Sequence, residues 1–560
     1  MMQRLACCGC LAASLWIAAE VARAEEPFVL RDVTSQSGVR FRHTDGSSGQ
    51  RYILEGMSAG LALLDYDSDG DLDLYLVNGA PLPDAKQTAA PGNALYRNDG
   101  NWRFSDVTAP AGVATGAFGL GVCAADYDND GFVDLYVSNY GPNVLYKNNG
   151  DGSFRDVTAE AGVAIGKHVG AGVSFFDMDA DGDLDLYAAN YIEFDMAAHK
   201  PYFHKGVPSY PGPLLYSPAS HVLFCNDANG TFSDVSRKSG VAQLKGYGMG
   251  VVAADYDDDG DQDLFVANDL QANFLLSNDG TGKFTDVALL AGTAFDLTGA
   301  SLANMGVDAA DFDNDGRTDF HVTTFSGEFA TLYRNLGGGV FEDATRLTGA
   351  GEGSFAHVKW GNAFADFDND GHRDLYVACG HLDENAQARG GTNATAFAVP
   401  NVVLRNLGNS RFRNVSATSG DGLKPAFSSR GVVSGDLDND GDLDIVVLNS
   451  RELPTLIRND TSSTNHWLGL RLIGSENNRG GVGAKVKVVC GSLTYMDEVH
   501  SGRGYQSDSG QWLHFGLGST TQVEKVEVRW PSGGVTTISG LRADQFIQMR
   551  ESKSDWLPVP

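Results

Sequence analysis

The sequence has little positive charge. It carries 41 lysines and arginines against 72 aspartates and glutamates, a formal net charge of −31. Such a chain repels the phosphates of nucleic acids, so we expect no nucleic-acid partner. A hydrophobic content of 42% nevertheless excludes a disordered chain. The acidity must therefore be explained within a folded protein.

Cysteine and long apolar runs are also scarce. Of seven cysteines, three lie in the first ten residues, and Cys123, Cys225, Cys379 and Cys490 have no C-x-x-C spacing, so no pairing is assigned. The apolar run from Leu5 to Ala19 is too short to span a bilayer, and Ala22-Arg23-Ala24 fits a leader cleavage site. We predict a signal peptide over residues 1–24, no transmembrane segment and a secreted or periplasmic protein.

Familiar catalytic motifs are missing as well. The sequence has no nucleophile elbow, H-E-x-x-H, P-loop or dinucleotide fingerprint in a supporting context, so no catalytic residue is predicted.

What the sequence has in abundance is one repeated acidic frame, D-x-D-x-D-G-x-x-D. It occurs seven times, 51 to 78 residues apart. Its aspartates at positions one, three, five and nine are Asp65, Asp67, Asp69 and Asp73; Asp126, Asp128, Asp130 and Asp134; Asp177, Asp179, Asp181 and Asp185; Asp255, Asp257, Asp259 and Asp263; Asp311, Asp313, Asp315 and Asp319; Asp366, Asp368, Asp370 and Asp374; and Asp436, Asp438, Asp440 and Asp444.

Four carboxylates in nine residues repel one another unless a cation lies between them. Hard oxygen ligands without His or Cys favour Ca²⁺, and the glycine at position six permits the sharp bend. We therefore predict about seven Ca²⁺ per chain, which explains most of the negative charge. An EF-hand is excluded because its twelfth position needs Glu, whereas these loops have apolar residues there, such as Leu76 and Val137.

The residues around each loop predict four short strands per repeat. A glycine-led run of small or apolar residues precedes the loop, and three further strand-like segments follow it, which is typical of a β-propeller blade. The chain opens with a fourth-strand segment, Leu30 to Thr34, and the last repeat lacks one after Leu456 to Asn459. We therefore predict that the N-terminal strand completes the last blade of a seven-bladed propeller over residues 25–460.

The remaining residues, 461–560, alternate between apolar and polar side chains, as in Val523 to Trp530. Period-two alternation predicts a small antiparallel β domain with one solvent-exposed face.

These motifs resemble the FG-GAP/VCBS repeats of integrin α-chain propellers, and more closely the cartilage acidic protein family with its C-terminal ASPIC/UnbV domain. The motifs of the C-terminal part are His466-Trp467-Leu468, Gly481 to Val486, Ser501 to Tyr505, His514 to Gly518 and Trp530 to Gly533. The resemblance implies an extracellular or periplasmic Ca²⁺-binding protein. One departure is Tyr505-Gln506-Ser507-Asp508, where the family has Tyr-x-Ser-Gln.

If the protein binds a ligand, the site is expected on the face opposite the calcium loops, around the mouth of the propeller channel. Each loop joins the innermost strand to its neighbour, so the other ends of these strands share that face. The candidates there are Glu55, His168, Tyr247, His357, Lys359, Arg430 and His381. They would bind an anionic or sugar-like ligand, or a second metal through the histidines; the alternative is that they are ordinary surface groups.

Three functions remain open at this point. The first is a calcium-binding module for adhesion or interaction, whose partner would be an unidentified protein or carbohydrate. The second is an exported enzyme with a polar site at the channel mouth, because propellers host many reactions. The third is a purely structural matrix component.

Overall fold

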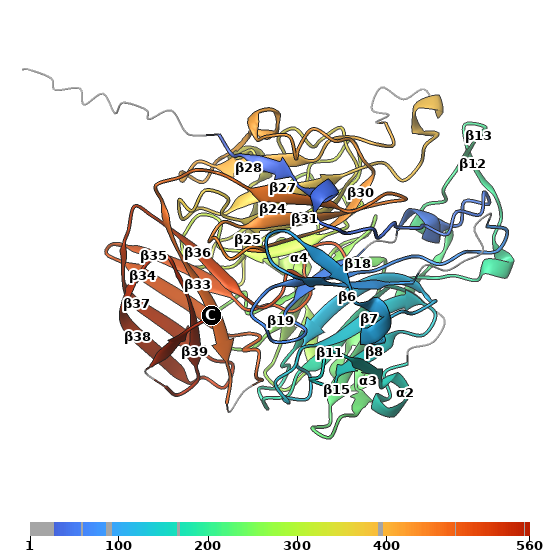
Figure 1. The fold of residues 1–560 in the computed structure, drawn as a ribbon. Coiled ribbons are helices and arrows are strands. Elements are labelled where there is room, and N and C mark those ends of the chain that lie inside the picture. The colour runs from blue at the N-terminus through green and yellow to red at the C-terminus, as the bar shows by residue number, and fades with distance from the viewer. Residues whose placement is uncertain are drawn as a thin grey trace, which may run out of the picture.

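The computed structural model describes residues 27–57, 60–85, 92–164, 168–389, 396–475, 478–553 and 555–559. The expected signal peptide lies outside the described residues. The chain is all-β, with one-turn helices such as α1 (Thr108–Ala111) after the fourth strand of several repeats. Figure 1 shows the C-terminal strands, in orange and red, gathered on one side of the molecule. In the part of the chain described, no helix is long and apolar enough to cross a membrane.

Each acidic loop joins the first two strands of a four-stranded antiparallel unit. In chain order the units are β2 (Leu61–Leu64), β3 (Asp73–Leu76), β4 (Ala94–Asn98) and β5 (Phe104–Asp106); β6 (Phe118–Ala125), β7 (Asp134–Tyr140), β8 (Val144–Asn148) and β9 (Phe154–Asp156); β10 (His168–Phe176), β11 (Asp185–Glu193), β15 (Val222–Asn226) and β16 (Phe232–Asp234); β18 (Gly248–Ala254), β19 (Asp263–Asn268), β20 (Phe274–Asn278) and β21 (Phe284–Asp286); β22 (Val307–Ala310), β23 (Asp319–Val322), β24 (Thr331–Asn335) and β25 (Phe341–Asp343); β26 (Lys359–Ala365), β27 (Asp374–Cys379), β28 (Val402–Asn406) and β29 (Phe412–Asn414); and β30 (Ser429–Gly435), β31 (Asp444–Asn449) and β32 (Thr455–Asn459) with β1 (Leu30–Asp32).

The N-terminal strand completes the last unit, as predicted. β1 pairs antiparallel with β32, and Leu30 lies opposite Asn459. The second and third units are joined into one ten-stranded sheet by a pairing of Val169 with Tyr140. The third unit also carries an insertion with the hairpin β12 (Tyr202–His204) and β13 (Val207–Ser209), followed by β14 (Ser217–Ser220), which pairs with β17 (Lys245–Gly246).

The first strands of consecutive units lie side by side, and β30 lies beside β2. Their glycines are needed because the backbones approach closely. A Cβ on Gly121 would meet the Ala171 carbonyl oxygen at 2.4 Å, and one on Gly250 would meet that of Met305 at 2.5 Å. The small residues before each loop, read as innermost strands, therefore leave room for the neighbouring unit.

An asparagine at the end of each third strand hydrogen-bonds to the acidic loop of a neighbouring unit. Asn148 Nδ2 donates to the carbonyl of Tyr66, the second residue of the preceding acidic loop, at 2.8 Å. The pattern recurs in every unit: Asn226 bonds to Tyr127, Asn278 to Met178, Asn335 to Tyr256, Asn406 to Phe312, Asn459 to Phe367, and Asn98, in the first unit, to Leu437 of the last loop. Unit contacts therefore run in chain order and connect the first unit to the last.

The C-terminal domain consists of two four-stranded sheets that share a buried core containing Leu470, Val488 and Val526. One sheet contains β35 (Leu493–Glu498), β34 (Lys485–Cys490), β37 (Gln522–Arg529) and β38 (Val535–Arg542). The other contains β36 (Leu513–Gly518), β33 (His466–Ile473), β39 (Gln545–Arg550) and β40 (Trp556–Pro558). The prediction of an antiparallel domain was wrong for one pair, since β33 and β39 run parallel. Both apolar faces are used against each other, which local alternation does not reveal.

A segment of the C-terminal domain runs between the first strands of the repeats. Residues 499–512, which connect β35 to β36, hydrogen-bond to several of these strands: Ser501 Oγ donates to Ala124 O at 2.9 Å, and Asp508 N donates to Leu61 O at 3.0 Å. Gly504 N donates to Val307 O at 2.7 Å. Tyr505 is completely buried. We call residues 499–512 the plug segment.

Candidate metal loops and a cavity on the opposite face

The carboxylates predicted to bind metal come together within their loops. Oxygen atoms of Asp126, Asp128 and Asp134 lie within 4.8 Å of one another. The same holds for Asp65, Asp67 and Asp73, for Asp177, Asp179 and Asp185, for Asp255, Asp257 and Asp259, and for Asp311, Asp313 and Asp315. The loops thus assemble oxygen clusters of the kind that hold a hard cation.

The aspartate at position three of every loop has a buried carboxylate oxygen without a hydrogen-bond partner. These atoms are Oδ1 of Asp67, Asp128, Asp179, Asp257, Asp313, Asp368 and Asp438. A buried polar atom left unpaired costs about 1–3 kcal/mol, more if it is charged. If the oxygen at this position is a metal ligand in every loop, all seven atoms would lack a protein partner, as they do here. The oxygen donors of these loops fit Ca²⁺.

The first aspartate shapes the loop. Asp126 accepts hydrogen bonds from the backbone N–H groups of Asp130, at 3.0 Å, and Gly131, at 2.7 Å. Gly131 has a φ of +99°, which an L side chain rarely adopts. The equivalent bonds form at Asp177, Asp311, Asp366 and Asp436.

The aspartate at position nine connects the loop to the sheet. Asp134 Oδ1 accepts from the Asn148 N–H at 2.7 Å, and Oδ2 accepts from the Tyr127 N–H at 3.1 Å. Burial raises the pKa of Asp134 well above its usual range, and it raises the pKa of Asp126 to about 6. Neighbouring aspartates add to this effect in both cases. A cation among these carboxylates would favour their charged forms.

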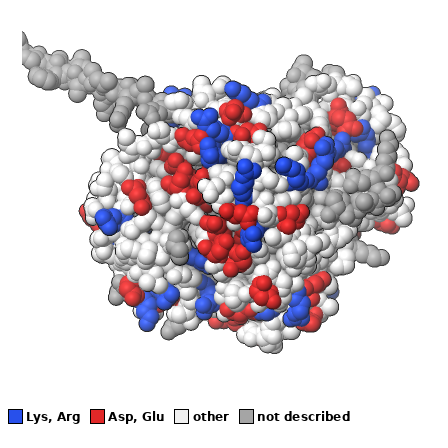
Figure 2. Space-filling view, viewed as in Figure 1, with Lys and Arg blue, Asp and Glu red and all other residues white. Residues whose placement is uncertain are grey.

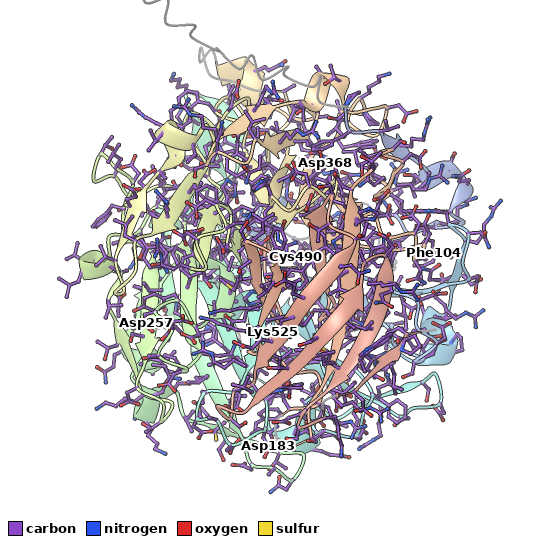
Figure 3. All side chains as sticks on the ribbon, turned by 90° about the vertical axis from the view of Figure 1, so that its left-hand side faces the viewer. Phe104, Asp183, Asp257, Asp368, Cys490 and Lys525 are labelled. Atoms are coloured by element: carbon purple, nitrogen blue, oxygen red, sulfur yellow. The ribbon has the colours of Figure 1, made fainter. Side chains whose placement is uncertain are left out.

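The C-terminal domain lies against the face of the repeats that carries these loops. Arg471 Nη1 lies 3.2 Å from Asp65 Oδ2, and Arg529 Nη2 lies 2.5 Å from Asp255 Oδ2. Figure 3 shows Asp183, Asp257 and Asp368, from three different loops, arranged around the C-terminal sheets that carry Cys490 and Lys525. On the face in Figure 2, basic side chains lie among more numerous acidic ones.

A cavity of about 210 Å³ lies on the opposite face, where the first strands begin and the second strands end. We call it the mouth cavity. Its walls come from five units and from the insertion of the third unit: Ile53, Gly56, Met57, Tyr191, Tyr210, Pro211, Gly212, Pro213, Met249, Asp269, Leu270, Ala303, Met305, Phe325, Glu328, Trp360, His381, Leu382 and Asp383.

Of the seven residues that the sequence placed at the mouth, His381 lines this cavity. Glu55 is buried and accepts hydrogen bonds from Ser48 and from the Tyr210 hydroxyl. The Tyr247 hydroxyl donates to the Tyr216 carbonyl at 3.0 Å. Glu55 therefore contacts Tyr210, a wall residue, without lining the cavity itself, and the partner of Tyr247 is not a wall residue.

Two basic residues of that set are buried and bonded to the protein. Lys359 Nζ donates to the carbonyls of Phe325, Glu328 and His357, at 2.8, 2.7 and 3.1 Å. Arg430 donates to Gly56, Ser428 and Ser429 and lies 4.1 Å above the ring of Trp360.

The two remaining histidines of the set are half-buried. His168 begins β10 and His357 precedes β26, and neither lines the mouth cavity. The structure therefore does not gather the seven residues into one pocket.

Sequence reasoning missed the methionines that line the cavity, and also Glu328 and Asp383. Met249 and Met305 each stand directly before the glycine of a first strand, Gly250 and Gly306. That repeated Met-Gly step was the available signal. Glu328 gave none, because it follows an irregular segment after β23.

Comparison with known families agrees with the repeat structure. A model described as "FG-GAP-like repeat" matches residues 65–137, 126–188, 255–322, 311–377 and 388–447. The chain belongs to the FG-GAP-like repeat family. A second model, "ASPIC and UnbV", matches residues 474–555. The FG-GAP-like repeats therefore cover the four-stranded units, and the ASPIC and UnbV match covers most of the C-terminal domain.

Among curated relatives, cartilage acidic protein 1 of Mus musculus is 26% identical over 523 residues, which cover 86% of this chain and 72% of the relative. The Homo sapiens protein of the same name is 26% identical over 507 residues, covering 85% and 69%. Among solved structures, the BP39L lectin from Burkholderia pseudomallei is similar with a TM-score of 0.45 and 10% identity, covering 73% of this chain and 97% of the lectin. YCF48 bound to D1 peptide has a TM-score of 0.40 and 7% identity, covering 78% and 96%.

Proposed function

We propose that this protein is an exported, calcium-binding β-propeller of seven blades that acts as a binding or adhesion module. The single observation that carries the proposal is the unpartnered, buried oxygen at the third position of all seven loops. One physical cause, a cation shared by the loop carboxylates, would explain all seven.

The cyclic order of the units supports seven blades. Each third-strand asparagine bonds to the preceding unit, and the bond from Asn98 to Leu437 connects the first unit to the last. β30 lies beside β2, and β1 occupies the outer position of the last unit. A closed ring leaves no free sheet edge along its inner strands, which protects the protein from edge-to-edge aggregation.

The chemistry of the loops supports Ca²⁺. The aspartates at positions one, three, five and nine would hold the ion in each loop, since they supply oxygen ligands alone. When bound, the ion supplies positive charge that stabilises the loop. The chain's own residues set the shape: the aspartate at position one fixes the turn, and the aspartate at position nine holds the loop against the third strand.

Binding is favoured over chemistry at the mouth because the basic residues there are engaged. Lys359 and Arg430 use their nitrogen atoms to hold backbone carbonyls in place, as described above. Export is supported by the predicted leader and by the acidic loops, which suit a compartment rich in calcium. The partner would be a protein or a carbohydrate.

Elemental analysis of the purified full-length chain tests this proposal. We expect about seven calcium ions per chain, one for each loop. A chain free of calcium after purification in millimolar calcium would contradict the proposal. A stoichiometric transition metal would favour the exported enzyme instead.

A further inference from the structure

The mouth cavity has acidic walls. Its charged lining residues are Asp269, Glu328 and Asp383, and no lysine or arginine is among the described residues that line it. Asp383 is paired with Arg51, whose Nη1 lies 2.9 Å from Oδ1. The ammonium of Lys359, near the cavity, already donates to three carbonyls. An anionic ligand would therefore meet three carboxylates, and the described lining residues offer it no lysine or arginine.

Asp269 has no counter-charge among the described residues and accepts a hydrogen bond from one side chain. The residue is only 8% exposed, and its Oδ2 accepts a 2.7 Å hydrogen bond from the Tyr191 hydroxyl. Within the described ranges, no Lys, Arg or His forms an ion pair with it. Glu328, by contrast, accepts from the backbone N–H groups of Ala303 and Phe325, at 3.0 and 3.2 Å. Burial, with the charge of Glu328 adding to it, raises the pKa of Asp269 to about 7.

The other walls suit a cation carried on an apolar body. Tyr191, Tyr210, Phe325 and Trp360 supply aromatic rings, whose faces attract cations. Arg430 already lies over Trp360 at 4.1 Å, so this ring makes a cation–π contact within the protein itself.

Three methionines, Met57, Met249 and Met305, complete the apolar part of the wall. Their unbranched side chains adapt to the shape of a ligand. A volume of about 210 Å³ admits a single side chain or a small molecule and excludes an oligosaccharide.

We propose that the mouth cavity binds an ammonium group on a small apolar body, with Asp269 as its counter-ion and the aromatic and methionine side chains around its hydrocarbon part. This inference rests on the proposed function, since it names the ligand class of a binding module. The ammonium could belong to a free amine or to a lysine side chain of a partner protein. Both present the same chemistry to Asp269.

Isothermal titration calorimetry of the full-length, calcium-supplemented chain tests this with n-hexylammonium, n-hexanoate and n-hexanol as probes. We expect saturable binding of the ammonium alone, weakened at least tenfold in Asp269→Asn. Glu193→Gln is the matched control: it removes a carboxylate from β11, the strand of Tyr191, but that carboxylate is exposed and pairs with Lys245 on the surface. This control should bind n-hexylammonium like the parent.

A second variant guards against misfolding of Asp269→Asn. Gly212 lines the cavity, and a Cβ added there meets nothing within 4 Å, so we expect Gly212→Trp to fold and to obstruct binding. An acetylated, amidated lysine peptide, compared with its norleucine analogue, distinguishes a protein side chain from a free amine. Binding of hexanoate or hexanol as tight as that of the ammonium, unchanged binding in both variants, or no binding of any amine would overturn the inference.

The two proposals fail separately, because the cavity and the acidic loops lie on opposite faces. Ammonium binding by a chain that holds no calcium would leave this inference standing and reject the calcium proposal. Seven bound calcium ions without ammonium binding would do the reverse.

Discussion

The hydroxyl of Tyr505 donates a 2.6 Å hydrogen bond to the carbonyl oxygen of Met57. Tyr505 belongs to the plug segment of the C-terminal domain, which lies against the acidic loops, whereas Met57 lines the mouth cavity on the other face. The ring of Tyr505 also packs edge-on against Trp360, with centroids 5.1 Å apart. A segment of the C-terminal domain therefore passes between the repeats and contacts two residues of the cavity wall, Met57 and Trp360.

Replacing Tyr505 tests this support. Tyr505→Phe leaves the Met57 carbonyl without its donor and should lower the free energy of unfolding by about 1–3 kcal/mol. Tyr505→Ala also leaves a cavity and should cost about 3–5 kcal/mol. Denaturant unfolding measures both. Tyr202→Phe, on the β12–β13 hairpin, is the control and should change little; equal effects of Tyr202→Phe and Tyr505→Phe would argue against the plug.

The asparagine bonds between units can be tested with two neighbouring residues. Asn148 is buried and its Nδ2 donates to Tyr66 O and Val133 O, whereas Asn149 is exposed and its Nδ2 donates to Ser153 Oγ. Asn148→Ala removes the donor to the buried Tyr66 carbonyl and to the partly buried Val133 carbonyl and should cost on the order of 2 kcal/mol or more. Asn149→Ala should cost less than 1 kcal/mol. Similar costs for the two variants, measured by thermal unfolding, would contradict the role given to Asn148.

One loop can be emptied without touching the others. Asp179→Ala removes the third-position carboxylate of the third loop, so elemental analysis should find one calcium ion fewer per chain than in the parent. Asp183→Ala is the control, because this side chain accepts from Asn129 and stands at position seven, where the backbone carbonyl is the expected ligand. An unchanged calcium content in Asp179→Ala would reject that loop as a site.

Acid should weaken the fold through His221. Its Nδ1 accepts the Asn190 N–H at 3.3 Å, and burial lowers its pKa from 6.5 to about 4. Because the folded state disfavours the charged form, this contribution is fully present above pH 6.5 and is lost as the pH falls toward 4. The loss should reach about 3 kcal/mol.

The difference between variants isolates this effect. Chemical unfolding of the parent and of His221→Gln, followed from pH 7 to 4, should show a shallower decline for the variant. His204→Gln, at an exposed hairpin position, should follow the parent. Parallel curves for the parent and His221→Gln would show that His221 does not contribute.

Much of the fold could be predicted because each repeat contains the sequence signals of its own strands and loop. Gly250, the loop beginning at Asp255 and the strand ending at Asn278 each recur at equivalent positions, so one unit describes the others. Even the pairing of β1 with β32 followed from a missing strand at one end and a spare strand at the other.

The plug segment could not be predicted, because many of its partners in the repeats are backbone atoms, which leave no mark in the sequence. Gly504 N bonds to Val307 O, and Asp508 N bonds to Leu61 O, bonds that most residues could make. Asp508, which departs from the family motif, turns out to accept from the Ala124 and Gly510 N–H groups, both at 2.8 Å. The sequence pattern does not reveal a partner as distant as Ala124, which lies 384 residues before Asp508.

The mouth residues illustrate a different limit. Lys359 and Arg430 were expected to face a ligand, and each is instead buried with backbone carbonyls as partners. A basic residue at the start of a strand is compatible with both arrangements. Only the fold, which brings the irregular segment from Phe325 to Glu328 over Lys359, decides between them.

Thermal unfolding with and without a calcium chelator tests the central claim most directly. Ions that bind only the folded chain stabilise it by mass action. We predict that chelation lowers the unfolding temperature by more than 10 °C and that added Ca²⁺, but not equimolar Mg²⁺, restores it. An unfolding temperature that is the same in chelator and in calcium would contradict the account.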